Sequence, residues 1–266
     1  MMWERDSLYR RALRNLVGRG VLHENMSVLV AAAGAPDRDA LQSLRFSNVT
    51  MTNISREPPA DLSPYHYETQ DLEALQYDDL SFDWALVSAS LHHCRSPHRA
   101  LLELYRVARR GVLALESRDS LAIRIALRFG VIEAYELASV AAEGFDKGGV
   151  RDSGIPNYVY RWTEREVEKT IASFAPEVQH QFIYFRALEL PLSLYSVDRR
   201  RRRVGRALAL SQPVLKALTR IAPRQTNLLA FAVVKPSGNS QLQPWLTRDR
   251  GRIVADRGWI ETHLES

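Results

Sequence analysis

Two adjacent histidines, His92 and His93, are the side chains of this sequence best suited to proton transfer. Imidazole titrates near neutral pH, so either one could act as a general base. Packing and positioning are the alternative roles for both. The pair follows an apolar segment, residues 82–89, which has the length of a buried strand. Ser88 and Ala89 end that segment, where parallel strands of an open sheet bind ligands.

A second group of residues lies around a turn made of small side chains. An apolar run, residues 28–32, leads into Ala32-Ala33-Gly34 and then Pro36, and a helical pattern follows. Small side chains let the backbone approach a ligand, and a helix N-terminus offers free N–H groups. The next strand, residues 49–53, ends on the amide of Asn53. Strand, small turn, helix and strand predict the opening of a nucleotide-binding doubly wound sheet.

The remaining elements complete this alternation. A capping-box spacing of Thr163 with Glu166 starts a helix to about residue 173, and Ser96-Pro97 starts another that Gly111 ends. An amphipathic helix is predicted at residues 6–17, and further strands at residues 65–68, 112–116, 178–185 and 228–234. Strands that alternate with helices predict a parallel sheet covered on both faces.

Residues 117–161 are less regular. They contain an apolar helix over residues 121–142, followed by glycines near clustered aromatic residues, which suggests a lid or a substrate pocket. The candidates for contact with a substrate are Asp146, Lys147, Tyr158, Tyr160 and Arg161. A structural cap with surface charges is the alternative interpretation.

Composition limits the class of protein. The 266 residues are 45% hydrophobic and 25% charged, as in a globular protein. No apolar run approaches the ~18 residues of a membrane span, and the first residues lack the apolar core of a signal peptide, so we expect a cytoplasmic protein. Cys94 is the single cysteine, and the histidines and acids lack metal-ligand spacing, so we expect no disulfide and no metal site.

The net charge of +5 is uneven, because five consecutive arginines, Arg199 to Arg203, equal the whole excess. The basic character is therefore a local patch. It fits a solvated helix face, a subunit contact in a homodimer, a phosphate-bearing acceptor, or an anionic membrane surface. Nucleic acid is the least favoured partner, since no stacking aromatics are interleaved with these arginines.

The ordered set of motifs between residues 27 and 117 resembles class I S-adenosylmethionine-dependent methyltransferases, in particular the group called methyltransferase type 11. The matching positions are Asp71, Phe82-Asp83, Leu91-His92-His93, Pro97, Glu103, Arg106-Val107 and Gly111. The resemblance implies an α/β fold: a doubly wound, mostly parallel seven-stranded Rossmann-like sheet with an antiparallel last strand and helical cap insertions. It also implies S-adenosyl-L-methionine as cofactor and S-adenosyl-L-homocysteine as product.

The resemblance assigns roles to individual residues. Ala32, Ala33 and Gly34 would lie against the methionine part of the cofactor, and Asn53 would hold the ribose. Asp71 and Leu72 would contact the adenine, Ser88 and Ala89 would line the site, and His93 is slightly favoured over His92 as the base. The sequence departs from the family in having one glycine where the family has three at alternating positions, and Asn53 where it has an acid. Alanine does not easily adopt positive φ.

We therefore expect a methyltransferase that acts on a small-molecule or glycan acceptor, at a hydroxyl group. The alternative is a non-catalytic binding or scaffold protein with a degenerate cofactor site. A nicotinamide oxidoreductase ranks third, since it would need Gly-x-Gly-x-x-Gly at the first turn. The expected organisation is a methyltransferase domain at residues 1–236, with cap insertions at about 117–162 and 186–226, and a polar tail at 237–266.

Overall fold

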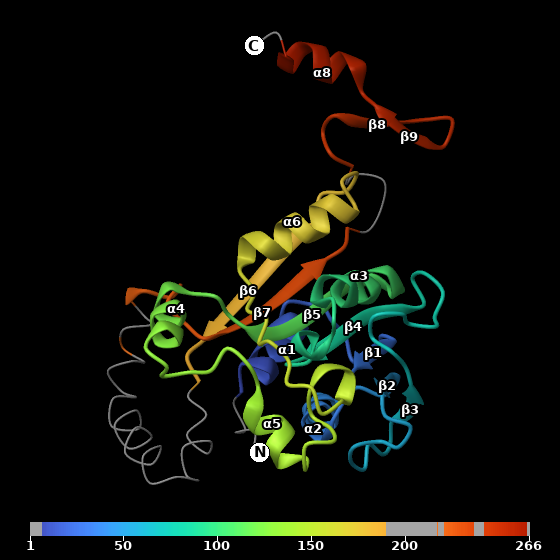
Figure 1. The fold of residues 1–266 in the computed structure, drawn as a ribbon. Coiled ribbons are helices and arrows are strands. Elements are labelled where there is room, and N and C mark those ends of the chain that lie inside the picture. The colour runs from blue at the N-terminus through green and yellow to red at the C-terminus, as the bar shows by residue number, and fades with distance from the viewer. Residues whose placement is uncertain (1–6, 190–216, 218–220, 237–241, 265–266) are drawn as a thin grey trace.

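The computed structural model describes residues 7–189, 217, 221–236 and 242–264. Most of the second predicted insertion, with Arg199 to Arg203, lies outside these residues. The core is a seven-stranded sheet (Figure 1) with the order β3-β2-β1-β4-β5-β7-β6. Its strands are β1 (Val28–Ala31), β2 (Val49–Asn53), β3 (His66–Thr69), β4 (Phe82–Ser88), β5 (Ala108–Ser117), β6 (Gln181–Ala187) and β7 (Leu228–Val234). β7 runs antiparallel to β5 and β6, and the first five strands are parallel, which confirms the predicted fold class.

Helices cover both faces of this sheet. α1 (Leu8–Gly18) and α2 (Ala35–Ser43) cover one face, and α3 (Pro97–Val107) and α6 (Glu164–Phe174) cover the other. The chain also forms α4 (Leu121–Arg128), α5 (Leu137–Ala142) and the short 3-10 turns η1 (Leu91–His93) and η2 (Val150–Asp152). One apolar cluster joins Val30 of β1 to α1 and α2, and the other joins Leu29 to α3 and α6. Alternate residues of the central strands are thus buried on opposite faces, as in a doubly wound sheet.

The two predicted helix starts are confirmed. The Ser96 hydroxyl accepts a hydrogen bond from the Arg99 amide (3.3 Å) with Pro97 in the first turn, and the Thr163 hydroxyl accepts one from the Glu166 amide (3.2 Å). Each hydroxyl satisfies an amide that has no partner within its helix. Both helices therefore begin where local side-chain chemistry fixes them.

Gly111 does not end a helix, contrary to the sequence interpretation. α3 ends at Val107, and Gly111 lies inside β5. A Cβ there would lie 2.7 Å from Trp84 Cη2 and 2.7 Å from the carbonyl oxygen of Val233. The glycine is needed so that a fully buried tryptophan can lie against the strand backbone.

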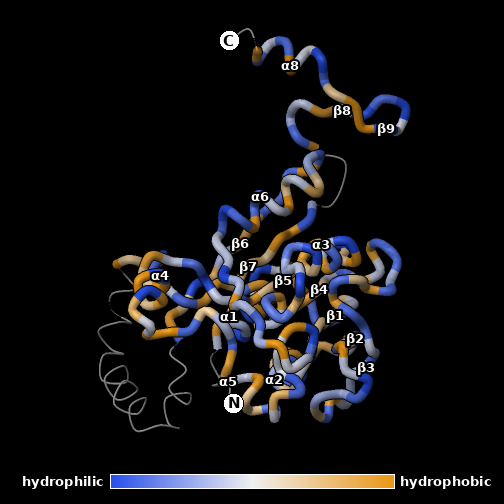
Figure 2. Tube along the Cα trace, viewed as in Figure 1, coloured by the Kyte–Doolittle hydropathy of each residue, from blue (hydrophilic) through white to orange (hydrophobic). Residues whose placement is uncertain are grey.

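The predicted long helix over residues 121–142 is instead two short ones, α4 and α5. Gly130 has φ +65°, and the amides of Gly130 and Val131 bond back to Leu127 and Ala126, which closes α4. α4 contains no buried residue, although Figure 2 shows apolar stretches along it as well as in the central sheet. Among the described residues no core lies beneath this helix, so its apolar composition did not mean burial.

The last described residues form a hairpin and a helix that extend away from the sheet (Figure 1): β8 (Leu246–Asp249), β9 (Arg252–Ala255) and α8 (Arg257–Leu264). Trp245 and Trp259 pack on each other, with ring centroids 5.8 Å apart. Backbone contact with the domain comes from the Gln243 amide, which donates to the Glu177 carbonyl (3.0 Å). In the described part of the chain, no helix is both long and apolar enough to cross a membrane.

Candidate functional site

A cleft of about 520 Å³ lies at the carboxyl ends of the parallel strands, where doubly wound sheets bind ligands. One side, here called the sheet wall, follows β1, β2, β3 and β4, and is formed by Ala32, Asn53, Asp71, Leu72 and Ser90. The opposite side, the cap wall, includes Lys147, Gly148, Gly149 and Arg151. His93 lines the cleft between the two walls. The topology thus brings together residues that the sequence analysis had placed in separate motifs.

The turn after β1 adopts the conformation that its composition disfavours. Ala32 has φ +51°, in the left-handed region, and lines the cleft. Such a conformation costs a non-glycine residue roughly 1–2 kcal/mol. Gly34, in contrast, has an extended backbone at φ −138°, and a Cβ added to it would meet nothing closer than 3.5 Å. The single glycine of the turn therefore occupies a position that does not need one, while an alanine occupies the position that would.

The Asn53 side chain, at the end of β2, makes hydrogen bonds with neighbouring backbone groups. Its Nδ2 donates to the Ala33 carbonyl (3.4 Å), and its Oδ1 accepts from the Ser55 amide (3.3 Å). The side chain therefore ties the first two strand ends together and also lines the cleft. Ala33 is fully buried beneath the turn, and neither Ala33 nor Gly34 is among the residues that line the cleft.

Asp71 joins the two walls. Its Oδ1 accepts from the Glu73 amide (2.9 Å), and its Oδ2 pairs with Nη2 of Arg151 at 2.5 Å. Leu72, beside it, is largely buried and lines the cleft. Arg151 was not singled out in the sequence. The carboxylate expected to contact adenine therefore already has a cationic partner from the cap.

Glu116, at the carboxyl end of β5, was also missed and organises the histidine pair. It is fully buried; its Oε1 accepts from the amides of Ser90 (2.9 Å) and Leu91 (2.7 Å), and its Oε2 lies 2.6 Å from His92 Nδ1. A carboxylate that ends a buried parallel strand is the signal that could have found it. Ser88 and Ala89 are not among the residues that line the cleft, whereas the next residue, Ser90, is.

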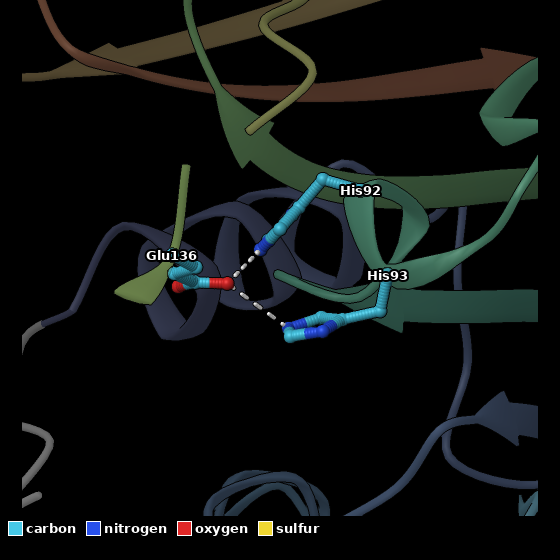
Figure 3. A group of neighbouring side chains, drawn as sticks. All are labelled: His92, His93 and Glu136. Atoms are coloured by element: carbon cyan, nitrogen blue, oxygen red, sulfur yellow. Dashed lines mark ion pairs between the residues drawn. The ribbon is translucent and has the colours of Figure 1, made fainter. Parts of the chain in front are cut away.

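His92, His93 and Glu136 form a group here called the histidine–glutamate cluster. Glu136 Oε2 lies 3.4 Å from Nε2 of His92 and 3.4 Å from Nε2 of His93 (Figure 3). Asn157, which is buried, donates to the same oxygen at 3.1 Å. The His93 Nδ1 faces the Gly149 carbonyl oxygen at 3.3 Å. No motif in the sequence linked Glu136 with the histidines.

Charges inside this cluster shift the pKa values of its members. Burial opposes protonation of His92, but Glu116 and then Glu136 outweigh it and raise the His92 pKa to about 10. Burial and the neighbouring His92 lower the pKa of His93. Burial would raise the pKa of Glu136, but the two histidines and Asn157 lower it to about 2. In this geometry His92 carries a proton between two carboxylates, and His93 is neutral.

The structure does not bring the five predicted substrate residues together. Lys147 lines the cleft, and the other four do not. Tyr158 packs edge-on against Tyr135, the Tyr160 hydroxyl contacts Glu166 and His98, and Arg161 donates to the carbonyls of Val159 and Glu133. Tyr158 and Arg161 hold the cap segment together by local contacts, and Tyr160 joins it to α3 and α6.

Comparisons with known proteins agree with this fold. Residues 37–115 match the methyltransferase domain family. A putative methyltransferase from Haloferax volcanii, solved with the Trm112 methyltransferase activator, has 12% identity and a TM-score of 0.50, and the match covers 87% of this chain and 94% of that one. YcgJ protein from Bacillus subtilis has 12% identity and a TM-score of 0.52, with coverage of 86% and 99%. An S-adenosylmethionine-dependent methyltransferase from Mesorhizobium loti has 14% identity and a TM-score of 0.50, with coverage of 86% and 98%. No curated protein matches the sequence.

The strand order and the cleft at the strand ends define the class I methyltransferase fold. Residues 37–115 match a methyltransferase domain, and the fold around them is shared with solved S-adenosylmethionine-dependent methyltransferases. The methyltransferase domain expected from the sequence motifs is thereby confirmed for these residues.

Proposed function

We propose that the chain is an S-adenosylmethionine-dependent methyltransferase that acts on a hydroxyl group of a small-molecule or glycan acceptor. The cofactor lies along the sheet wall: its methionine part against the turn at Ala32, its ribose at Asn53, and its adenine between Asp71 and Leu72. The acceptor enters beside the cap wall and places its hydroxyl near His93.

The sheet wall has the chemistry that this cofactor requires. A cleft of about 520 Å³ is within the usual range of small-molecule sites, roughly 300–1,000 Å³. Asn53 makes one contact through each end of its amide, which leaves a second Nδ2 hydrogen and an Oδ1 lone pair for ribose hydroxyls. Asp71 Oδ2 is an acceptor for an adenine amino group once Arg151 shares or leaves it.

The observation that carries the acceptor proposal is the position of His93. It lines the cleft, and Nδ1 donates to the Gly149 carbonyl, so Nε2 presents a lone pair next to Glu136. In the reaction the methyl C–S bond breaks as a C–O bond forms, and the sulfonium becomes a neutral thioether. The hydroxyl proton leaves toward the histidine–glutamate cluster. The walls contribute chiefly alignment and exclusion of water.

The scaffold alternative is favoured by two specific features: the alanine at a positive-φ position and the Arg151 guanidinium on Asp71. Both would weaken cofactor binding without altering the fold. Direct binding measurements separate the two functions.

The experiment is calorimetric titration of the full chain with S-adenosylmethionine and S-adenosylhomocysteine, using Asp71→Asn and the control Asp146→Asn, an exposed acid outside the cleft. We expect micromolar binding that Asp71→Asn weakens about tenfold, since a charge-assisted hydrogen bond contributes ~1.5–3 kcal/mol. Asp146→Asn should bind as the wild type does. Folded protein that binds neither ligand at millimolar concentration would support the scaffold instead.

Cofactor-binding protein then enters an acceptor screen that begins with glycans and measures release of S-adenosylhomocysteine. With an active acceptor, His93→Gln should lower kcat and leave the affinity for S-adenosylmethionine unchanged. Turnover of amines with no turnover of any hydroxyl compound would contradict the hydroxyl proposal.

A further inference from the structure

The histidine–glutamate cluster has the arrangement of a metal site, although the spacing of these residues in the sequence gives no such indication. One ligand atom each from His92, His93 and Glu136 lies within 4.8 Å of the other two. The two imidazoles come from consecutive residues of η1, and Glu136 immediately precedes α5 on the cap. Figure 3 shows both rings directed at the same carboxylate oxygen.

Contacts behind the cluster decide which atoms face inward. Glu116 accepts two backbone N–H groups through Oε1, and His92 Nδ1 donates to its Oε2 at 2.6 Å. The Gly149 carbonyl can only accept, so His93 Nδ1 is also a donor. Once a metal ion displaces the second proton of His92, both Nε2 atoms direct a lone pair toward the space beside Glu136 Oε2. Three electron-rich atoms that converge in this way require a cation between them, either a proton or a metal ion.

We propose that His92 Nε2, His93 Nε2 and Glu136 bind a divalent transition metal ion of the zinc type. Zinc–ligand bonds of about 2.0–2.1 Å in a tetrahedron place neighbouring ligand atoms about 3.4 Å apart. The two N···O separations here are both 3.4 Å, and the two nitrogens lie within 4.8 Å of each other. Two imidazole nitrogens also favour zinc over magnesium or calcium, which prefer oxygen ligands.

The groups around the cluster are those that usually orient the ligands of a metal site. Metal-ligating histidines usually donate their other ring N–H to a carboxylate or a backbone carbonyl, and both arrangements occur here, at Glu116 and Gly149. The buried Asn157 holds the Glu136 oxygen at 3.1 Å. Each of the three ligands is therefore oriented by a group outside the cluster.

Three protein ligands leave one tetrahedral position open, and His93 places it beside the cleft. In a role that rests on the proposed function, the open position binds the acceptor hydroxyl. There the metal lowers the hydroxyl pKa, and the proton leaves to water in the cleft as the C–O bond forms, because His93 Nε2 is then a ligand and not the base. Metal binding itself does not depend on that role.

The test is calorimetric titration of tag-free, chelator-treated full-length protein with Zn²⁺ in the absence of S-adenosylmethionine. We expect one Zn²⁺ per chain, bound at micromolar concentration or below. Co²⁺ in place of Zn²⁺ should give the visible absorption of tetrahedral cobalt. Absence of binding at millimolar Zn²⁺, with circular dichroism showing folded protein, would overturn the proposal.

Variants separate this site from adventitious binding. Glu136→Gln and His93→Gln should each weaken Zn²⁺ binding by about tenfold or more, and Asn157→Ala, which removes an orienting contact, should weaken it by about tenfold. The control is His66→Gln, which breaks an exposed His66–Glu68 pair and should leave binding unchanged. If His66→Gln weakens Zn²⁺ binding and Glu136→Gln does not, the ion binds at the surface and the proposal fails.

The readouts also separate the two proposals. Zn²⁺ binding in protein that does not bind S-adenosylmethionine keeps the metal site and removes the proposed function. Protein that takes up no Zn²⁺ can still bind S-adenosylmethionine and turn over an acceptor, with no effect of a chelator. That result removes the metal site and keeps the proposed function.

Discussion

The two walls of the cleft are held in place by different forces. The sheet wall stands on β1, β2 and β4, whose central residues, such as Val30 and Leu86, are fully buried. The cap wall belongs to a segment with little core: α4 has no buried residue, and α5 has only Val140. The cap meets the sheet wall through polar contacts, among them Arg151 with Asp71 (2.5 Å) and Gly149 with His93 (3.3 Å).

This difference indicates how the cleft responds to ligands. Because the sheet wall rests on buried apolar strands, it is displaced only when the whole protein unfolds. Ion pairs and hydrogen bonds at half-exposed positions contribute far less, so the cap wall can shift when a ligand or a metal changes the local charge. Substitutions in the sheet frame should therefore change stability, and substitutions in the cap should change binding.

The largest expected effect is on the stability of the sheet and its packed helices, here called the frame, and it is expected at Glu164 of α6. Its carboxylate receives two 2.8 Å bonds from the buried Arg118, which directly follows β5, and one of 2.6 Å from Arg186. Glu164→Gln leaves Arg118 buried without its charge partner, so we expect a loss of about 3 kcal/mol or more in the free energy of unfolding, measured with urea. Glu168→Gln, on the exposed side of the same helix, should cost under about 1 kcal/mol. Equal effects of the two would show that this ion pair does not secure the frame.

A pH effect of nearly the same size is expected from Asp37 in α2. Burial raises the Asp37 pKa to about 6, which the hydrogen bond from the Gly34 amide (3.0 Å) only partly offsets. Because the folded pKa is raised, the stabilising contribution is present below about pH 4 and is lost as the pH rises through about 6, a change of ~3 kcal/mol at 1.36 kcal/mol per pKa unit. The unfolding free energy of the wild type minus that of Asp37→Asn, measured with urea, should fall by this amount as the pH rises. The same difference for Asp39→Asn, a substitution at an exposed neighbour, should not change with pH.

Two glycines test the comparison, one in the sheet that supports the sheet wall and one in the cap wall. Gly111→Ala places a methyl group 2.7 Å from Trp84 Cη2 inside the sheet, so we expect a loss of about 1–3 kcal/mol in unfolding free energy. In Gly149→Ala the methyl group would overlap the carbonyl oxygen of Ile155 in the cap, which must then move. That variant should keep the global stability within about 1 kcal/mol and weaken ligand binding. A large drop in stability for Gly149→Ala would mean that the cap is part of the core.

The smallest effect is expected at the turn of the sheet wall. Ala32→Gly relieves the positive φ of +51°, and after the entropy that glycine adds to the unfolded chain it should raise the unfolding free energy by ~0.5–1 kcal/mol. Ala33→Gly, at a buried position without positive φ, should lower it by a similar amount. Thermal and urea unfolding of the two variants measures both changes in unfolding free energy. Destabilisation by both variants would show that the Ala32 conformation carries no strain.

Local patterns in the sequence were enough to predict the frame. The apolar run at Val28, the N-caps at Ser96 and Thr163 and the polar strand end at Asn53 each set an element that the structure confirms. The motifs around His92 and His93 also indicated the methyltransferase class. These features could be predicted because backbone hydrogen bonding and side-chain period depend on nearby residues.

The residues that those elements bring together follow from tertiary packing alone. Glu116, Glu136 and Arg151 meet the histidines and Asp71 across separations along the chain that no local pattern encodes. Gly111 was misassigned because its neighbour in space, Trp84, lies on another strand. Ala32 takes a disfavoured φ because the Ala33 amide is held by the Thr52 carbonyl (2.8 Å) of the adjacent strand. Packing between elements overrides the local preference there, and the same packing creates the cluster at which we place the metal.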